Sequence, residues 1–150
     1  MADVQKAKAD VQKAVMRAAV AVHNRIYRAS GGRLGGTVRG VPVLLLTVAG
    51  RRTGRPHTTP VAYLDSGGRY VVSGTAGGSP TEPQWFRNLR HADRAVVQVG
   101  PRQVRVTVEI APPAERDMLW EQLVARAPSF ARYRSRTERE MPVAVLTPVP

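Results

Sequence analysis

Residues 43–64 read VLLLTVAGRRTGRPHTTPVAYL. The apolar run Val43–Ala49 is short and is bounded by Pro42 and Gly50, which predicts a buried strand. Residues 57–64 predict a second strand, and the tight connection between the two carries three arginines. Because so short a connection joins antiparallel neighbours and not parallel ones, this stretch predicts a hairpin with a basic turn.

Outside this hairpin, the chain alternates further strands with helices. A turn at Asp65–Gly68 leads into a third strand, and valines that alternate with polar residues from 103 to 110 predict a half-buried strand. The other elements are predicted as helices over residues 4–29, 82–91, 113–126 and 129–139 and as strands over residues 69–74, 95–99 and 143–147. Tight turns between strands exclude a doubly wound parallel sheet. The prediction is therefore one α+β domain over residues 1–150, mainly β, with about six mostly antiparallel strands and peripheral helices.

The predicted N-terminal helix has an alanine-rich apolar face. Its apolar positions recur at three- and four-residue steps from Val4 to Ile26, opposite lysines and arginines. This amphipathic pattern predicts a helix that covers one side of the domain, and the alternative is a helix that lies on a membrane surface. The sequence predicts neither a signal peptide nor a bilayer-spanning segment. We therefore expect a cytoplasmic protein. Peripheral contact of residues 1–30 with the inner face of the cell membrane is the alternative that the sequence leaves open.

The composition is strongly basic and includes no cysteine. The net charge is +12, and the lack of cysteine excludes disulfides, thiolate metal sites and cysteine nucleophiles. No Asp or Glu occurs between Val11 and Leu64, a stretch that contains Arg17, Arg25, Arg28, Arg33, Arg39, Arg51, Arg52 and Arg55. Such a field favours an anionic partner, which is nucleic acid, a membrane face, or a small molecule with phosphate or carboxylate groups. The basic residues are not interleaved with exposed aromatic residues, which argues against nucleic acid.

Three segments are candidates for a binding site. The turn at residues 50–57 combines two glycines with arginines that supply forked donors for a phosphate. It is either a phosphate-binding site or a basic hairpin that is only solvated. The glycine-rich loop at residues 73–78 permits the close approach of a flat ring or a phosphate. Phe130 and Tyr133 are three residues apart and share a helix face, so they either cap a pocket or pack on the sheet.

These segments occur in an order that is typical of one family. The shared residues are the strand Val43–Thr47, the turn Gly50–Pro56, Pro60, Gly67, Gly68, Arg69, Tyr70, Gly77, Gly78, Pro83, Trp85, Asn88, Leu89, Trp120, Leu123, Pro128, Phe130, Tyr133 and the terminal strand. With this ordered set, the chain resembles the deazaflavin-dependent nitroreductase family, a branch of the flavin/deazaflavin oxidoreductases. The resemblance implies a split β-barrel over residues 41–150 that follows the N-terminal helix.

The resemblance also implies the cofactor coenzyme F-420, an 8-hydroxy-5-deazaflavin that carries a phosphate and an oligoglutamate tail. Carried over by position, the expected cofactor contacts are Arg51, Arg52, Thr53, Gly54, Arg55, Pro56, His57, Pro60, Val61, Ser73, Thr75, Ala76, Gly77, Gly78 and Trp85. The expected substrate contacts are Thr75, Trp85, Phe130 and Tyr133. Tyr133 is the candidate catalytic residue as a proton donor, with His57 or water as alternatives. Better-known members have a lysine in place of Ala76 and tyrosines in place of Ala127 and Phe130.

The activity implied by the resemblance is hydride transfer from reduced coenzyme F-420 to a flat conjugated acceptor: a quinone, a nitroaromatic compound or an enone. Such a reaction requires that ring and acceptor be held face to face, and it requires no catalytic triad or carboxylate pair. The alternatives are a split barrel that binds FMN and a non-catalytic carrier of a cofactor or a lipid. The sequence leaves open whether the protein is a monomer or a homodimer.

Overall fold

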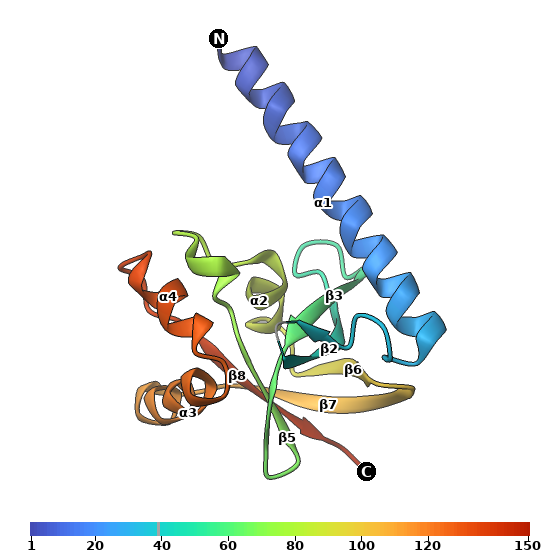
Figure 1. Ribbon diagram of the computed structural model, residues 1–150, viewed down its shortest axis with the longest axis vertical. Coiled ribbons are helices and arrows are strands. Elements are labelled where there is room, and N and C mark those ends of the chain that lie inside the picture. The colour runs from blue at the N-terminus through green and yellow to red at the C-terminus, as the bar shows by residue number, and fades with distance from the viewer. Residues whose placement is uncertain (39) are drawn as a thin grey trace.

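The computed structural model describes residues 1–38 and 40–150, so that Arg39 lies outside the described residues. In this part of the chain the helices are α1 (Ala2–Ser30), α2 (Gln84–Leu89), α3 (Pro113–Arg126), α4 (Ser129–Ser135) and the short 3₁₀ helix η1 (Ala76–Gly78) (Figure 1). The strands are β1 (Thr37–Val38), β2 (Val41–Ala49), β3 (Pro56–Ala62), β4 (Leu64–Ser66), β5 (Arg69–Ser73), β6 (Arg94–Val99), β7 (Arg102–Ile110) and β8 (Val143–Pro148). These elements confirm the predicted α+β fold with peripheral helices.

The strands form a barrel because β3 and β4 are two halves of one extended segment that is interrupted at Tyr63. All of β3 pairs with β2, whereas β4 pairs with β5. The other pairs join β1 to β2, β2 to β6, β6 to β7, β7 to β8 and β8 to β5, and each is antiparallel. At the interruption, the N–H of Tyr63 donates to the carbonyl of Pro42 at 3.0 Å. The strand predicted over residues 57–64 is thus divided where it changes partner, and the predicted split β-barrel is confirmed.

The two faces of the barrel strands bury two clusters of apolar side chains. The barrel interior holds side chains from the strands and from α2, including Leu44, Leu46, Val48, Val61, Tyr70, Val72, Phe86, Leu89, Val97, Val106 and Leu146. The outer face of β5 and β8 is covered by α3 and α4 through Leu119, Trp120, Leu123 and Phe130. α3 therefore buries the face that its sequence predicts. In β7, Val106 is buried between exposed Arg105 and Thr107, as the predicted alternation requires.

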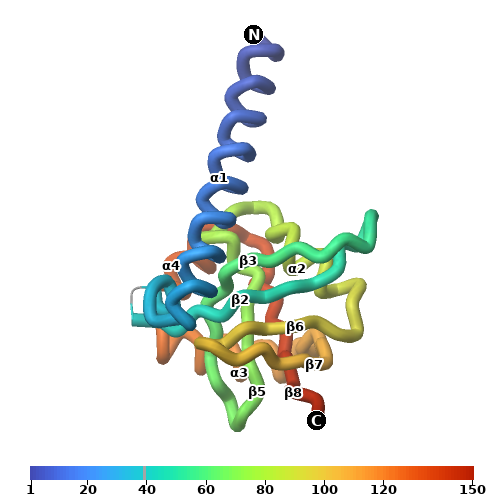
Figure 2. Tube along the Cα trace, turned by 90° about the vertical axis from the view of Figure 1, so that its right-hand side faces the viewer, coloured from blue at the N-terminus to red at the C-terminus, as the bar shows by residue number. Residues whose placement is uncertain are grey.

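α1 projects from the barrel instead of covering it, so the prediction that its alanine-rich face packs on the domain is wrong (Figures 1 and 2). Val4 and Val11 on that face are 59% and 62% exposed, whereas Tyr27 is buried. The last turns of the helix contact the barrel, where Asn24 Nδ2 donates to the carbonyl of Thr58 at 3.1 Å. The alanine-rich face does not determine how α1 packs, because its small side chains bury little apolar area. Among the helices of the described residues, none combines the length with the apolar character that a bilayer span requires.

Tyr27 attaches the end of α1 to the turn between β6 and β7. Its hydroxyl donates to the carbonyl of Gln98 at 3.1 Å and accepts from the N–H of Gly100 at 2.8 Å. Burial raises the pKa of this hydroxyl above its ordinary value, and the N–H of Gly100 acts in the opposite direction. The protonated side chain is therefore part of the joint between helix and barrel.

Replacing Tyr27 with phenylalanine is expected to lower the free energy of unfolding by about 1 to 3 kcal/mol near neutral pH, because two backbone groups lose their partner. The raised pKa sets the pH dependence of this effect. The hydroxyl makes its full contribution to the free energy of unfolding below about pH 10, which is its pKa in the unfolded chain. This contribution falls as the pH rises through the folded-state pKa. Urea unfolding of both proteins at about pH 7 and about pH 10.5 measures it. The difference between them should shrink at the higher pH, and an equal difference at both would contradict the assignment.

Candidate functional site

The basic turn between β2 and β3 is closed by its own backbone. The N–H of Gly50 donates to the carbonyl of Arg55 at 2.8 Å, and the N–H of Gly54 donates to the carbonyl of Gly50 at 2.8 Å. Gly54 has a φ of +73°, a conformation that favours glycine. Thr53 Oγ1 accepts from the N–H of Arg55 at 3.2 Å. The closed turn leaves the side chains of Arg52 and Arg55 exposed to a ligand.

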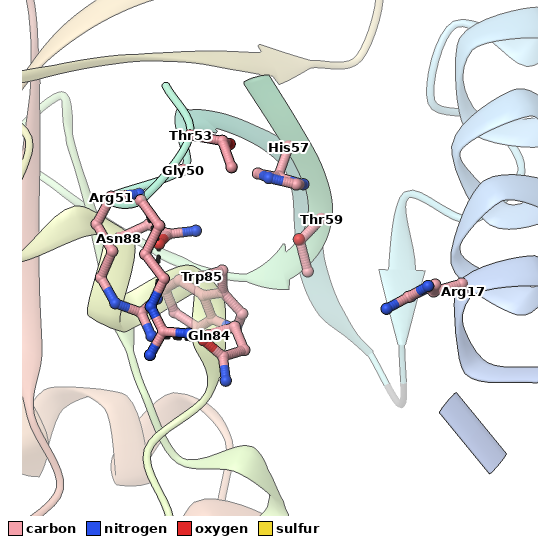
Figure 3. Close-up of a pocket in the computed structure, with 10 residues that line it drawn as sticks. Arg17, Gly50, Arg51, Thr53, His57, Thr59, Gln84, Trp85 and Asn88 are labelled. Carbon is pink, nitrogen blue, oxygen red and sulfur yellow. Dashed lines mark hydrogen bonds between the residues drawn. The ribbon is translucent and has the colours of Figure 1, made fainter. Parts of the chain in front are cut away.

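Arg51 is held against α2 by two neutral amide oxygens (Figure 3). One terminal nitrogen of its guanidinium donates to Asn88 Oδ1 at 2.8 Å, and the other donates to Gln84 Oε1 at 2.8 Å. The N–H of Arg51 also donates to Asn88 Oδ1, at 3.2 Å, and Asn88 is 7% exposed. Amide oxygens orient the guanidinium without neutralising its charge. This arrangement prepares a fixed cation for an anionic ligand.

His57 lies over the start of the same turn. A side chain at Gly50 would place its Cβ 3.0 Å from His57 Nε2 and 3.2 Å from Thr53 Oγ1. Contacts that short are tighter than ordinary van der Waals contact, so a side chain at position 50 would displace the His57 ring or the Thr53 hydroxyl by a few tenths of an ångström. His57 is exposed, and it faces the cavity beside the turn (Figure 3).

A cavity of about 570 Å³ lies between the basic turn, β3, α2 and α1. Its lining residues are Arg17, Gly50, Arg51, Arg52, Thr53, His57, Thr59, Gln84, Trp85 and Asn88, a set without an acidic residue. The ion pairs of the described residues join Arg90 to Glu82 and Arg116 to Asp117 and Glu140, all outside this set. Within the described residues, no group of His, Cys, Asp and Glu side chains could hold a metal ion. The volume is typical of a cofactor pocket, and the donor set fits a ligand with a phosphate.

The glycine-rich loop around η1 packs against α4 and is hydrogen-bonded to the segment that follows α4. Arg139 Nε donates to the carbonyl of Ser79 and its terminal nitrogen donates to the carbonyl of Thr75, both at 2.8 Å. Arg136 donates to the carbonyl of Gly77 at 3.2 Å. The hydroxyl of Ser73, which is buried, donates to the carbonyl of Pro142 at 2.8 Å. The loop and the segment after α3 therefore form one packed unit.

The aromatic residues of α4 lie in this second unit. The Phe130 ring is 8% exposed, with its centroid 6.1 Å from that of Trp120 and 5.5 Å from that of Tyr133. Tyr133 is partly buried, and the guanidinium of Arg136 lies 5.9 Å from its ring centroid. Neither Phe130 nor Tyr133 lines the cavity at the basic turn. Their roles toward a substrate, and that of Tyr133 as proton donor, stay predictions.

The structure thus distributes the expected contact residues over two places. Five of them line the cavity: Arg51, Arg52, Thr53, His57 and Trp85. Gly54 and Arg55 belong to its turn, and Pro56 is the first residue of β3. Pro60 is partly buried in β3, and Val61 points into the barrel core. Ser73 ends β5, and Thr75, Ala76, Gly77 and Gly78 lie in the loop that follows it, beside α4. The cavity residues that the sequence did not single out as contacts are Arg17, Gly50, Thr59, Gln84 and Asn88.

The barrel and its arginine-lined cavity define a class: split-barrel proteins with a site for an anionic ligand. The family model described as "F420H(2)-dependent quinone reductase" matches residues 19–148, and the chain belongs to this family. The expected kinship with deazaflavin-dependent enzymes is thereby confirmed.

Two related proteins agree with this assignment, and a third is similar in sequence and fold. A protein of Mycobacterium tuberculosis (strain ATCC 25618 / H37Rv), named as an F420H(2)-dependent quinone reductase, is 36% identical over 130 residues, which cover 84% of this chain and 87% of the relative. The solved structure of an F420-H2 dependent reductase is 27% identical, with a TM-score of 0.65, and covers 70% of this chain and 93% of its own. Another solved structure, titled a domain-swapped dimer, is 27% identical, with a TM-score of 0.67, and covers 82% of this chain and 92% of its own.

Membership in the family makes this chain a deazaflavin-dependent oxidoreductase with coenzyme F-420 as its cofactor and a small molecule as its substrate. The chemistry of the cavity fits this cofactor, because its fixed and exposed arginines have no acidic neighbours in the lining set. The match supports the deazaflavin over FMN, and an enzyme over a non-catalytic carrier.

Proposed function

We propose that this protein reduces quinones with reduced coenzyme F-420, and that the cofactor's phosphate binds at the Gly50–His57 turn. The placement of the phosphate is supported by the two hydrogen bonds of Arg51. Asn88 and Gln84 orient its guanidinium at 2.8 Å and leave its positive charge uncompensated. The names of the relatives supply the acceptor, since they are quinone reductases. Nitroaromatic compounds and enones are further proposed acceptors, because they are also flat and conjugated.

The residues of the cavity have distinct roles in this proposal. The turn and its arginines bind the phosphate, and the half-buried Trp85 forms a flat wall that orients the ring system. The cofactor, when bound, supplies the hydride from a ring carbon. The chain therefore has to hold donor and acceptor face to face and to exclude water from between them. Because His57 lines the same cavity, His57 or water is the proposed donor of the proton to the acceptor oxygen.

The assembly and location of the protein are separate parts of the proposal. Similarity to a domain-swapped dimer supports a homodimer over a monomer. A second copy would also cover part of the apolar face of α1, where Val11 is 62% exposed. A cytoplasmic location stays a prediction from the sequence. The relatives give no support for membrane contact, which is not proposed.

Anaerobic mixing tests the reaction. The protein, reduced coenzyme F-420 and a soluble quinone should together restore the absorbance of the oxidised cofactor, at a rate proportional to the protein concentration. A nitroaromatic compound and an enone in parallel reactions rank the acceptors. A rate with every quinone equal to that of the protein-free mixture would contradict the proposed activity.

A further inference from the structure

α1 contributes one residue to the wall of the cofactor cavity. Arg17 lines the cavity from the side opposite α2, and its guanidinium is directed toward the space between them (Figure 3). The family model begins only at residue 19, so this residue lies outside the matched region. Arg17 is therefore a feature of this chain that the family match does not describe.

The position of Arg17 follows from the way α1 is attached. Asn24 Nδ2 donates to the carbonyl of Thr58 at 3.1 Å, and Arg28 donates to the hydroxyl of the same residue at 3.4 Å. Arg17 precedes Asn24 by seven residues, which is about two helical turns or about 10 Å along the axis, and it lies on the same helix face. A helix attached by Asn24, Tyr27 and Arg28 thus holds Arg17 beyond the edge of β3, at the outer side of the cavity.

Arg17 and Arg51 differ in what their side chains contact. The guanidinium of Arg51 is fixed by two amide oxygens at 2.8 Å, whereas Arg17 is exposed and takes part in none of the three ion pairs of the described residues. An exposed arginine on a helix can reorient toward an anion. Since the turn already supplies the donors for one phosphate, a ligand that reaches Arg17 as well must carry a second anionic group at a distance from that phosphate.

We propose that Arg17 binds the carboxylates of the glutamate tail of coenzyme F-420 and so makes α1 part of the cofactor site. The inference rests on the proposed placement of the cofactor's phosphate at the Gly50–His57 turn. The tail would leave the turn toward α1, through a stretch of sequence without Asp or Glu between Val11 and Leu64. An exposed pair between arginine and carboxylate contributes modestly to affinity and is weakened by salt.

The test is calorimetric titration of the full chain with two ligands: oxidised coenzyme F-420 with its tail, and the same phosphorylated deazaflavin without glutamates. Arg17→Ala should weaken binding of the tailed cofactor by about fivefold at low salt and leave the affinity for the tailless one unchanged. Arg25→Ala is the matched control, because Arg25 is exposed on the same helix and does not line the cavity. It removes the same charge and should change neither affinity.

A third variant separates this inference from the proposal beneath it. Arg51→Ala should weaken both ligands, because the phosphate is common to them. Suppose that Arg51→Ala weakens binding of both ligands. If Arg17→Ala then weakens binding of neither ligand, or of both ligands equally, the role of Arg17 is wrong and the phosphate site stands. If Arg51→Ala changes neither affinity, the cofactor lies elsewhere, and the inference about Arg17 is overturned with it.

Discussion

Arg51→Ala is expected to weaken binding of oxidised coenzyme F-420 by about tenfold or more, since a charge-assisted hydrogen bond contributes about 1.5 to 3 kcal/mol. The effect is large because the side chain is already oriented. Asn88 Oδ1 and Gln84 Oε1 each accept from it at 2.8 Å, so little conformational entropy is lost when an anion binds. The neutral partners leave the positive charge available to the phosphate.

The measurement is a titration of wild type and variant with the oxidised cofactor at fixed ionic strength. Arg105→Ala is the matched control, because Arg105 is exposed on β7 and lies outside the cavity lining. Arg51→Ala also removes the guanidinium donor of the buried Asn88 oxygen and leaves it only the backbone N–H at position 51, so thermal melts must confirm that the variant is folded. Equal affinities of wild type and Arg51→Ala would contradict the assignment of the turn.

Gly78→Ala is expected to be strongly destabilising, with a loss of about 2 to 5 kcal/mol in the free energy of unfolding. Gly78 has a φ of +86°, and a Cβ there would lie 2.6 Å from the carbonyl oxygen of Tyr133 in α4. The substitution combines left-handed backbone strain with a clash against another backbone. Backbone cannot turn aside as a flexible side chain can, so α4 or the loop must shift.

Gly77→Ala is the matched control for this prediction. Gly77 also has a positive φ, +64°, but nothing lies within 4 Å of a Cβ built on it. This variant should lose only the strain term, about 1 to 2 kcal/mol. Chemical unfolding of both variants measures the two effects. Equal losses for Gly77→Ala and Gly78→Ala would contradict the close contact between loop and α4.

The sequence predicted elements well where apolar periodicity and packing agree. α3 buries Leu119, Trp120 and Leu123, the residues that its sequence places on one face. In α1 the apolar periodicity predicted the wrong packing face, because the contacts with the barrel come from Asn24 and Tyr27. Their hydrogen bonds to backbone groups far along the chain leave no trace in a hydrophobic pattern.

The basic turn could be predicted as an anion site because charge and glycine content are local properties of the sequence. The partners of Arg51 could not be, since Asn88 lies 37 residues away and the contact depends on how α2 packs against the end of β2. Asn88 stands among the residues that carry the family resemblance, which is the one sequence feature that pointed to it. Arg17 was visible only as part of an acid-free stretch, because a helix pattern does not show where the helix is attached.

A crystal structure of the protein with oxidised coenzyme F-420 tests the central claim most directly. We predict that the phosphate will lie within hydrogen-bonding distance of Arg51 or Arg52 at the Gly50–His57 turn, with the ring system beside Trp85. The alternative location is the surface groove between α3 and α4, which Trp120, Val124 and Arg134 line. A phosphate in that groove, or anywhere else outside the turn, would contradict the account.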